Sequence, residues 1–492
     1  MMMKALATVI ACVLVMLVGV TVASAKPIRS IREWVKGDGK TDDAVGVAKA
    51  FDACKGNAFT LQVDCPVLLH IGRDIARPIF VDNGTHVVFA KGGLFIIDNI
   101  LQPAFVLADT SDVQFLGWNV QYVGGIPIDR RAGGYLKDGV AVADGYPSPV
   151  FNDIVVTPWL ETHRGVKFTD PAAKHAIWHG PTNLSSVFYL IGDTKQVDIE
   201  NMRLYVPATA GGNQFIPMAF SLACGYVPNT TAAPGIGVPG NWVGVPGIAV
   251  PSQLTFKNIT LDGYYMGFQG TSHQSTFTNI TGLRYGDLQD ADGGNIGGVE
   301  KWFAPPHLFY FNGPRESPYD PVLSNQNITI AHVRDIGPRV GKARDTSPLK
   351  RSGYANSLKI GAVDSSVTDY ESNRPDGLLD VLSCRNMTLA VIKGTYDSSF
   401  LNDLYPGVRF PSGDYYQSLT MRNVTLTDTS PTPYATSTDK LPLPFSGARG
   451  ANNSNIVFDN VVVNLKSWTR PVIQPEYSGL GNKTSIKFNI GP

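Results

Sequence analysis

The feature that most constrains the fold is a short motif that recurs along the chain. An apolar residue, any residue, a second apolar residue and any residue precede an Asn, which is followed by an apolar residue and often by Thr. Asn258 and Asn279 are 21 residues apart, whereas Asn386, Asn423 and Asn460 follow one another at intervals of 37. A rung of about 21 residues, lengthened in places by loops, is typical of a solenoid. The motif is expected to mark one position of every rung, held by Asn201, Asn258, Asn279, Asn327, Asn386, Asn423 and Asn460.

Asparagine suits such a position for two physical reasons. Its side chain tolerates the left-handed backbone of a tight turn better than most residues do. Its amide can also hydrogen-bond to the amide of the same residue in the next rung, about 4.8 Å away.

The chain between residues 58 and 123 consists of short apolar runs separated by Gly, Asn and Asp. These runs are too short for helices, and their regular punctuation predicts many small strands. Each rung would bury its apolar side chains inside the coil, so the interior is expected to be a packed core. The expected strands are 60–63, 67–71, 79–81, 86–89, 94–97, 105–107, 113–115 and 120–123.

A tight turn and one amphipathic helix precede these strands. Gly37-Asp38-Gly39 predicts the turn, because glycine adopts positive φ freely. Thr41 or Asp42 can accept hydrogen bonds from the first helical turn, and Asp43 adds negative charge at its positive end. From Ala44 to Cys54 the apolar residues fall on one helical face. A lone helix in front of a long β chain suits the closing of an open solenoid end.

The run GDGKTDDAVGVAKAFDAC resembles the GDGxTDD-plus-helix opening of the pectate-lyase-like right-handed parallel β-helix proteins. That group includes polygalacturonases, other polysaccharide hydrolases and lyases, epimerases and phage tailspikes. The resemblance implies an all-β chain folded as a right-handed parallel β-helix, a solenoid with an N-terminal capping helix. The motif is informative about the fold and much less so about the reaction.

Residues 1–25 predict a secretory signal peptide. Lys4 precedes an apolar run over 5–22, and Ala23-Ser24-Ala25 forms a cleavage site with small residues. The alternative is an uncleaved membrane anchor, because the run approaches the length of a spanning helix. Cleavage would leave a mature chain from Lys26 with no membrane span, located outside the cell, in a periplasm or at the cell surface.

We expect one domain after the signal peptide. Residues 26–60 would form the cap region, and residues 61–492 would form the β-helix. Three stretches interrupt its rhythm with Gly and Pro, near 124–167, 206–252 and 430–450. Insertions in a solenoid gather on one face and often carry function.

The net charge bears on the binding partners of the protein, and the cysteines bear on its disulfides. Lys and Arg number 41, as do Asp and Glu, so no net charge favours nucleic acid. A polysaccharide is the expected partner. In an exported chain Cys54 and Cys65 are close enough in sequence to form a disulfide behind the capping helix.

The first catalytic candidates are Asp376 and Asp397, joined by Asp380. Asp376 and Asp397 are 21 residues apart, so neighbouring rungs would bring their Cα atoms within about 5 Å. Two adjacent carboxylates do not both ionise readily, which would raise one pKa as a general acid requires. The alternative is that these Asp residues only cap turns.

The same run loosely resembles a polygalacturonase pattern, Asn-Thr-Asp-Gly followed by a strand and Gly-Asp-Asp. That resemblance implies that Asp376 and Asp397 act as a pair. The run departs from the pattern, because Arg374-Pro375 replaces the Thr and Ser398 replaces the second paired Asp. Gly-His-Gly and Arg-Ile-Lys motifs are missing downstream.

A second candidate region is the Gly-rich loop around Asp287, Asp290 and Asp292. Clustered carboxylates suit Ca²⁺ or a pair of catalytic acids, although the spacing is not that of an EF-hand. No other cofactor is expected. Aromatic faces stack on sugars, and Arg can hold a uronate carboxylate with two hydrogen bonds. The substrate-binding candidates are His273, Trp302, His307, Tyr310, Arg315 and Arg374.

A third feature is basic. Eliminative cleavage of a uronate needs a cation to neutralise the carboxylate and a base to withdraw the C5 proton. A solvated loop is the plainer interpretation of this run, which contains Arg334, Arg339, Lys342, Arg344, Lys350, Arg351 and Tyr354.

The sequence therefore favours an exported enzyme that cleaves a polysaccharide, with glycoside hydrolysis by the Asp residues preferred. The first alternative is a lyase that uses the basic run with His307 or Tyr310. The second is a carbohydrate-binding or surface solenoid that turns nothing over.

Overall fold

The computed structural model describes the following residues: 26–70, 79–98, 103–124, 128–129, 134–137, 140–142, 186–207, 218–223, 225–226, 248–264, 266–283, 307–311, 325–336, 357–373, 378–396, 408–410, 416–429, 454–466 and 486–491. Residues 1–25, and with them the expected signal peptide, lie outside this set, as do most residues of the three expected insertions. In the described part of the chain, no helix is long and apolar enough to cross a membrane.

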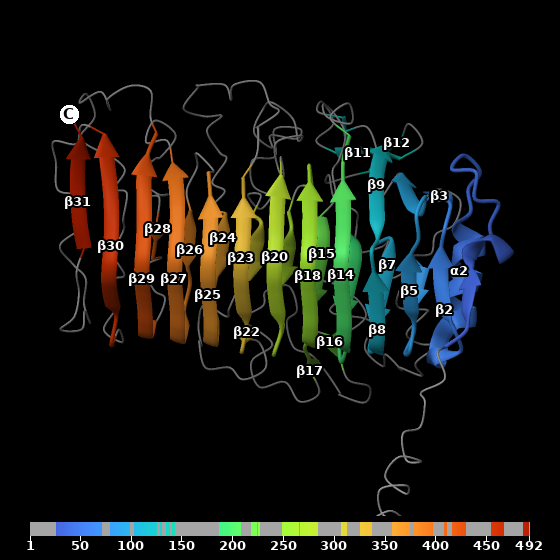
Figure 1. Ribbon diagram of the computed structural model, residues 1–492, viewed down its shortest axis with the longest axis horizontal. Coiled ribbons are helices and arrows are strands. Elements are labelled where there is room, and N and C mark those ends of the chain that lie inside the picture. The colour runs from blue at the N-terminus through green and yellow to red at the C-terminus, as the bar shows by residue number, and fades with distance from the viewer. Residues whose placement is uncertain are drawn as a thin grey trace, which may run out of the picture.

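The described residues form two large parallel sheets, sheet A with 17 strands and sheet B with nine (Figure 1). Sheet A has 17 strands: β1 (Ile28–Ser30), β2 (Thr60–Val63), β3 (Pro66–His70), β5 (His86–Phe89), β6 (Leu94–Asp98), β8 (Ser111–Leu116), β9 (Asn119–Gly124), β14 (Lys195–Tyr205), β18 (Ser252–Asp262), β20 (Thr276–Leu283), β22 (Asn325–Gln326), β23 (Thr329–Asp335), β25 (Ala362–Ser372), β27 (Cys384–Tyr396), β29 (Tyr416–Asp428), β30 (Val457–Lys466) and β31 (Ile486–Gly491).

Sheet B has nine strands: β4 (Ile79–Val81), β7 (Phe105–Ala108), β13 (Ser186–Ile191), β15 (Met218–Ala223), β19 (Phe268–Gly270), β21 (Phe309–Phe311), β24 (Leu358–Ile360), β26 (Leu379–Val381) and β28 (Val408–Arg409). Two small antiparallel sheets lie apart from these. One contains β10 (Ile128–Asp129), β11 (Gly134–Lys137) and β12 (Val140–Val142), and the other contains β16 (Gly225–Tyr226) and β17 (Ile248–Ala249).

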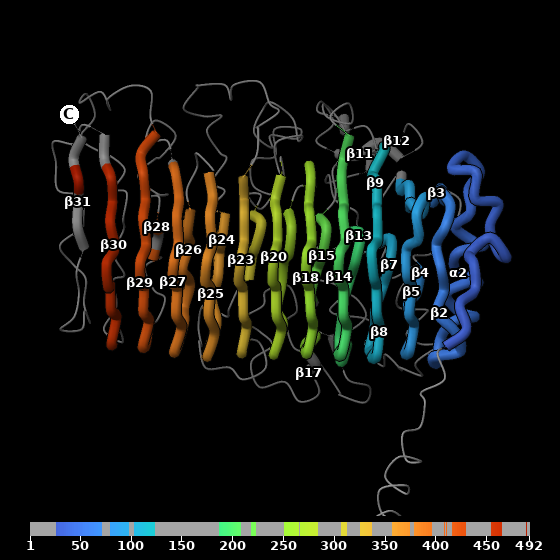
Figure 2. Tube along the Cα trace, viewed as in Figure 1, coloured from blue at the N-terminus to red at the C-terminus, as the bar shows by residue number. Residues whose placement is uncertain are grey.

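The chain alternates between the two large sheets, and each strand pairs in parallel with the strand one rung away. The order β13, β14, β15, β18, β19, β20 shows this alternation. The near strands of Figure 1 point upward while the stack grows to the left, so a chain that returns behind them winds as a right-handed coil. Figure 2 shows the rungs stacked along one axis. The expected fold class, an all-β right-handed parallel β-helix, is confirmed.

The five longest strands of sheet A, β14, β18, β25, β27 and β29, each contain two residues with positive φ, five positions apart. In the rungs of β20, β23 and β30, the first of these two residues precedes the strand. In β14, Val197 and Ile199 point into the core before the second of these residues, Asn201, and Met202 and Leu204 do so after it. Strict alternation would have turned residue 201 inward. A residue with left-handed backbone therefore shifts the alternation of inward and outward side chains by one position. It also bends the strand around the core.

These residues form two columns across sheet A. We call the first the leading column; it contains Gln196, Gln253, Gln274, Asn327, Asp364, Asn386, Ser418 and Asn455. We call the second the central column; it contains Asn201, Asn258, Asn279, His332, Asp369, Val391, Asn423 and Asn460.

The expected amide ladder is present in the central column. Asn258 donates from Nδ2 to Asn201 at 2.8 Å, and Asn279 donates to Asn258 at 2.9 Å. The expectation that all motif Asn residues share one position is wrong, because Asn327 and Asn386 lie in the leading column. Residues of both columns adopt the same left-handed backbone conformation, which favours Asn in either column. A search for the Asn motif therefore cannot distinguish the two columns.

The core is a stack of aromatic rings on the inner side of sheet B. Phe188 and Phe220 are 5.0 Å apart between ring centroids, Phe220 and Phe268 are 4.8 Å apart, and Phe268 and Phe309 are 5.1 Å apart, all nearly parallel. These distances follow from strand spacing, because identical residues at one register position lie one rung apart. The regular coil thereby fills its own interior.

The capping helix α2 (Ala44–Cys54) packs on β2, β3 and β4 at one end of the coil. Two short 3-10 turns, Ile31–Glu33 and Lys55–Asn57, flank it. As expected, Asp42 accepts a hydrogen bond from the first helical turn, with Oδ1 3.0 Å from the Ala44 amide nitrogen. Asp43 is the N-cap residue at this end of the helix, and its two oxygens accept from the amides of Lys36 and Gly37. It therefore fixes the loop that leads into the helix.

The expected disulfide between Cys54 and Cys65 is wrong. Both residues are buried free thiols. Cys54 Sγ donates to the Phe51 carbonyl at 3.4 Å, within the helix. Cys65 packs instead against the turn before the helix, where a side chain on Gly37 would come within 2.5 Å of its sulfur. The two cysteines thus contact different parts of the core.

Candidate functional site

The outer face of sheet B carries one polar residue per rung over four successive strands. The middle residues of β21, β24 and β26 point outward, because their neighbours on either side are buried in the core. We call this set the outer row; it consists of Gln269, Tyr310, Lys359 and Asp380, in register from one strand to the next. Arg409 of β28 is the next residue in register.

An ion pair lies at one end of the outer row. Lys359 Nζ is 3.6 Å from Asp380 Oδ2, and the two side chains are only 12% and 4% exposed. An outward-facing residue of a solenoid is usually solvated, so a nearly buried carboxylate here is unusual. Burying both charges removes their hydration, and the pairing offsets that loss only while both partners stay in place.

Tyr310 joins this pair to a histidine. Lys359 Nζ lies 4.8 Å from the centre of the Tyr310 ring, close enough for a cation–π contact. The buried His307 ring stacks on Tyr310, with centroids 5.0 Å apart and planes 14° from parallel. Met218 and Met266 form a separate apolar cluster against which Tyr310 packs. Tyr310 is therefore held on several sides by the protein.

This arrangement can perform acid–base chemistry. Asp380 can exchange a proton, Lys359 can neutralise an anionic group, and the Tyr310 hydroxyl can donate or accept a hydrogen bond. Strands of one sheet are about 4.8 Å apart, so a linear substrate along the coil axis would meet one residue of the row per strand.

The outer row unites Tyr310 and Asp380, which the sequence singled out in two separate regions, and His307 stacks on Tyr310 beside it. Asp380 was expected to be catalytic, whereas His307 and Tyr310 were expected to bind substrate. The two regions meet because β24, which carries Lys359, pairs with β21 on one side and β26 on the other. His273 lies elsewhere, three residues before β20 of sheet A, where its backbone bridges Ser252 and Gln326.

Several expected site residues lie outside the described part of the chain: Trp302, Arg315, Arg374, Asp376 and Asp397, together with Asp287, Asp290 and Asp292. The pairing of Asp376 with Asp397 and the Ca²⁺ site stay predictions. Among the described residues no group of three or more metal-ligating side chains lies together.

Sequence reasoning missed Lys359 and Gln269. A signal for Lys359 was available, because it precedes Asp380 by 21 residues, the same interval that suggested the pairing of Asp376 with Asp397. That interval had been applied to carboxylates alone. Gln269 has no comparable signal, since the next residue in its row, Tyr310, follows it by 41 residues.

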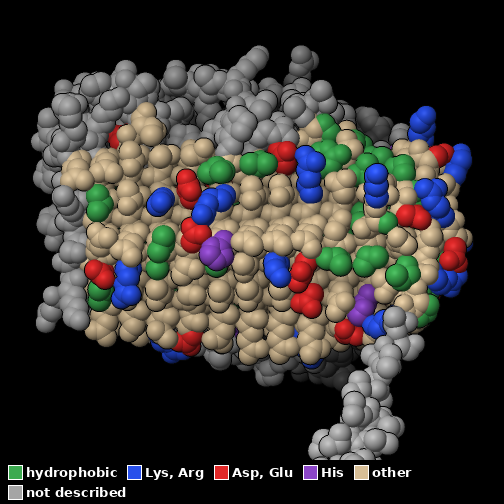
Figure 3. Space-filling view, viewed as in Figure 1, with side chains coloured by type: hydrophobic (Ala, Val, Ile, Leu, Met, Phe, Trp, Pro, Cys, Tyr) green, Lys and Arg blue, Asp and Glu red, His purple; other side chains and the backbone are tan. Residues whose placement is uncertain are grey.

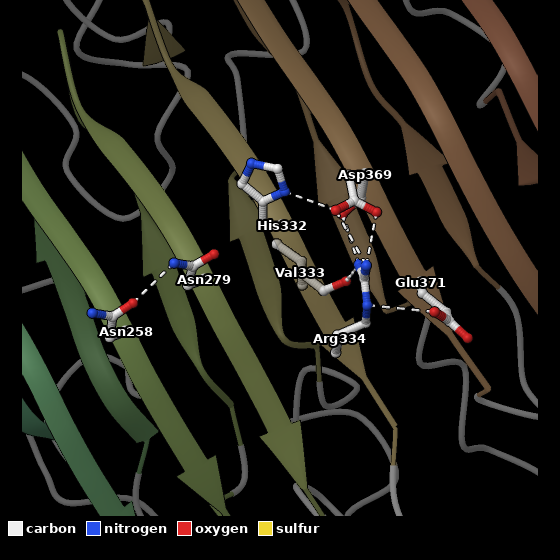
Figure 4. Close-up of polar contacts among 7 residues, drawn as sticks. All are labelled: Asn258, Asn279, His332, Val333, Arg334, Asp369 and Glu371. Atoms are coloured by element: carbon white, nitrogen blue, oxygen red, sulfur yellow. Dashed lines mark hydrogen bonds and ion pairs between the residues drawn. The ribbon is translucent and has the colours of Figure 1, made fainter.

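A second polar cluster lies on the opposite side of the molecule, on the outer face of sheet A (Figure 4). Asp369 accepts from His332 Nδ1 at 2.7 Å and from Arg334 at 2.9 and 3.2 Å. These contacts, His332 first, hold the pKa of the Asp369 carboxyl below its usual range. Arg334 also contacts Glu371 at 3.4 Å. Arg334 of the expected basic run is thus committed to a surface ion-pair network.

This cluster replaces the amide ladder in two rungs of the central column. His332 and Asp369 are in register with Asn279 and pair with each other as the asparagines do. Figure 3 shows further charged side chains scattered over this face among uncharged ones. We interpret the cluster as a structural substitute for the ladder.

Comparison with known proteins gives similarity of structure only. No protein-family model and no curated protein sequence matches this chain. The chain is similar to a solved surface adhesin of Streptococcus pneumoniae at 10% identity and a TM-score of 0.46, with 94% of this chain and 91% of that chain covered. It is similar to an exopolygalacturonase from Thermotoga maritima at 10% identity and a TM-score of 0.45, with 94% and 91% covered. A mannuronan C-5 epimerase module from Azotobacter vinelandii follows at 8% identity and 0.41, with 92% and 99% covered.

The chain has a right-handed parallel β-helix fold. Polygalacturonases and epimerases are among the proteins that the opening motif resembles, and the strand register of this β-helix confirms the architecture which that resemblance implied. Shared fold at such low identity says nothing about the reaction. The chemistry of this β-helix has to be argued from its own outer row.

Proposed function

We propose that this β-helix cleaves a polysaccharide bound along the outer row. The observation that carries the proposal is the register of Tyr310, Lys359 and Asp380, which places an aromatic hydroxyl, an ammonium and a carboxylate on three adjacent strands. Such a row matches a repeating linear ligand better than a compact one, because its polar groups recur at the strand spacing. The nearly buried Lys359–Asp380 pair supports a chemical role for these charges.

Glycoside hydrolysis is the preferred reaction. Asp380 would act as one of the two carboxyl groups that hydrolysis requires, either protonating the glycosidic oxygen or activating water. The Lys359 ammonium, 3.6 Å away, would hold the Asp380 carboxyl group in place. The second carboxyl group is expected from Asp376 or Asp397.

Elimination at a uronate is the second candidate, favoured by the position of Lys359 above Tyr310. The ammonium would neutralise the substrate carboxylate, which makes the C5 proton easier to remove. Tyr310 or His307 would take part in that proton transfer. This candidate needs no second carboxyl group from the protein.

A panel of neutral and acidic polysaccharides separates these reactions. Hydrolysis releases reducing ends without ultraviolet absorbance, whereas elimination also forms an unsaturated product that absorbs. A protein that is retarded in a polysaccharide gel but forms no product would be a binder, and this outcome would refute cleavage. Absence of both product and retardation across the panel would refute the proposal altogether.

The variant Asp380→Asn tests the residue assignment. If Asp380 transfers a proton, kcat should fall by about 10²–10⁴-fold. The matched control is Asp198→Asn, which changes an outward-facing carboxylate on sheet A, far from the row. Thermal melting of both variants separates lost chemistry from lost folding. Unchanged kcat in a folded Asp380→Asn protein would remove Asp380 from the mechanism.

A further inference from the structure

A buried polar cluster lies inside the coil beneath the outer row. Asp335 is the last residue of β23 and is in register with Gly282 and Ser372, a position that points into the core. Asp335 is 4% exposed. Ser357 Oγ donates to Asp335 Oδ2 at 2.5 Å, and Ser372 Oγ donates to the same oxygen at 3.2 Å. Ser357 Oγ is also 2.6 Å from the hydroxyl of Tyr370.

Small residues share this inward position with Asp335. Gly282 occupies it one rung before Asp335, and Gly394 occupies it one rung after Ser372, where the Leu378 side chain fills the adjacent space. Larger side chains, such as Leu261 and Leu426, hold this position farther along the coil. The core is therefore shaped around Asp335, although a polar group inside it costs free energy unless it is well hydrogen-bonded.

Ser357 connects this cluster to the outer row. Its carbonyl accepts from the amides of Leu308 and Phe309 at 3.0 and 3.2 Å, at the start of β21. Ser357 directly precedes β24, so Lys359 lies two residues after it. The next amide, that of Leu358, donates to the Leu378 carbonyl at 3.1 Å, two residues before Asp380.

We infer that Asp335 is a positioning residue for the outer row, an inference that rests on the proposed function. By holding the Ser357 hydroxyl, Asp335 fixes the point from which β24 starts. Lys359 then lies at its observed height between Tyr310 and Asp380. An ammonium 3.6 Å from a carboxylate and 4.8 Å from a ring centre tolerates little displacement.

The test observes Lys359 without any substrate. Lysines of the full chain are dimethylated with ¹³C-formaldehyde, and the Lys359 signal in the NMR spectrum is assigned by its loss in Lys359→Arg. Ser357→Ala removes one hydroxyl, and Asp335→Asn keeps the shape while changing the charge. Both variants should move the Lys359 signal, because its distance from the carboxylate and the ring changes. The control is Asp262→Asn, a buried carboxyl group at the end of β18, two rungs from Asp335, and it should leave the signal in place.

The outcomes are distinct. If Ser357→Ala lowers the melting temperature but leaves the Lys359 signal unchanged, the cluster only stabilises the core and the inference is overturned. If the signal moves, the inference holds for the geometry even where no polysaccharide is cleaved. In an active protein, kcat should fall in Ser357→Ala more than in Asp262→Asn. Asp335→Asn can fail to fold, in which case Ser357→Ala alone decides.

Discussion

Lys359 Nζ lies 3.6 Å from Asp380 Oδ2 on the next strand, and the same ammonium lies 4.8 Å from the centre of the Tyr310 ring on the strand before. Three consecutive rungs thus meet at one cation. The relationship exists only because the coil stacks residues that are far apart in sequence: Tyr310 and Lys359 are separated by 49 positions. The parallel register of β21 and β24 brings these two residues into contact.

Removing the cation should destabilise the protein strongly. Lys359→Met leaves the Asp380 carboxylate without its ammonium at a site that is 4% exposed, so we expect a loss of about 3–5 kcal/mol in the free energy of unfolding. Urea denaturation measures it. The control is Lys257→Met, whose partner Glu200 is 3.8 Å away at the surface, with an expected change within about 1 kcal/mol. Equal losses in the two variants would contradict a buried pair.

Val391 should be replaceable with a gain in stability. It holds a central-column position at φ 54° and is 44% exposed, although a β-branched residue is strained in that conformation. Val391→Asn should stabilise the fold by about 1 kcal/mol, measured by urea denaturation. The reverse change, Asn423→Val in the next rung, should destabilise it and also deprive Asn460 of its acceptor. A loss of stability in Val391→Asn would show that the valine makes a contact of its own.

The ion pairs of Asp369 should stabilise the folded protein at pH values above the range in which the Asp369 carboxyl group titrates. Because its pKa is lower in the folded protein than in the unfolded chain, folding gains stability above the unfolded value of about 3.9. That gain is lost as the pH falls through the folded value. His332→Gln removes the first cause of the shift, so the Asp369 carboxyl should titrate nearer its usual range. Carboxyl ¹³C NMR follows this directly, and an unchanged titration would assign the shift to Arg334 alone.

Asp43 should contribute more to the free energy of unfolding than an exposed acidic residue of the helix that follows it. Asp43→Ala leaves the amides of Lys36 and Gly37 without their acceptor, at an expected cost of about 1–3 kcal/mol. Asp52 is the control, because its side chain is 69% exposed and pairs with Lys55 at the surface. Comparable melting temperatures for Asp43→Ala and Asp52→Ala would mean that the loop does not depend on Asp43.

Thiol chemistry checks the correction of the disulfide. Burial raises the pKa of the Cys54 thiol to about 12, so a thiol reagent should not label it in the native protein at neutral pH. Denaturant should make both Cys54 and Cys65 reactive without prior reduction. A melting temperature lowered by dithiothreitol would show that a disulfide forms after all.

The sequence alone determined those features that rest on local physical chemistry. The expected helix bounds match α2, and the strands expected at 60–63, 79–81 and 86–89 match β2, β4 and β5. Apolar periodicity and punctuation by Gly and Asn are local signals, so they predict elements well. The left-handed preference of Asn likewise revealed the turns, but it could not separate two columns only five residues apart.

Only the tertiary structure decided which side chains meet. Loops of unequal length separate the rungs, so no fixed interval leads from Gln269 to Tyr310 or from Tyr310 to Lys359. The prediction of a disulfide between Cys54 and Cys65 was wrong for the same reason. Residues that are close in sequence need not meet in the core. Strand register depends on how whole rungs pack on one another, and packing is a property of the assembled coil and not of any one segment.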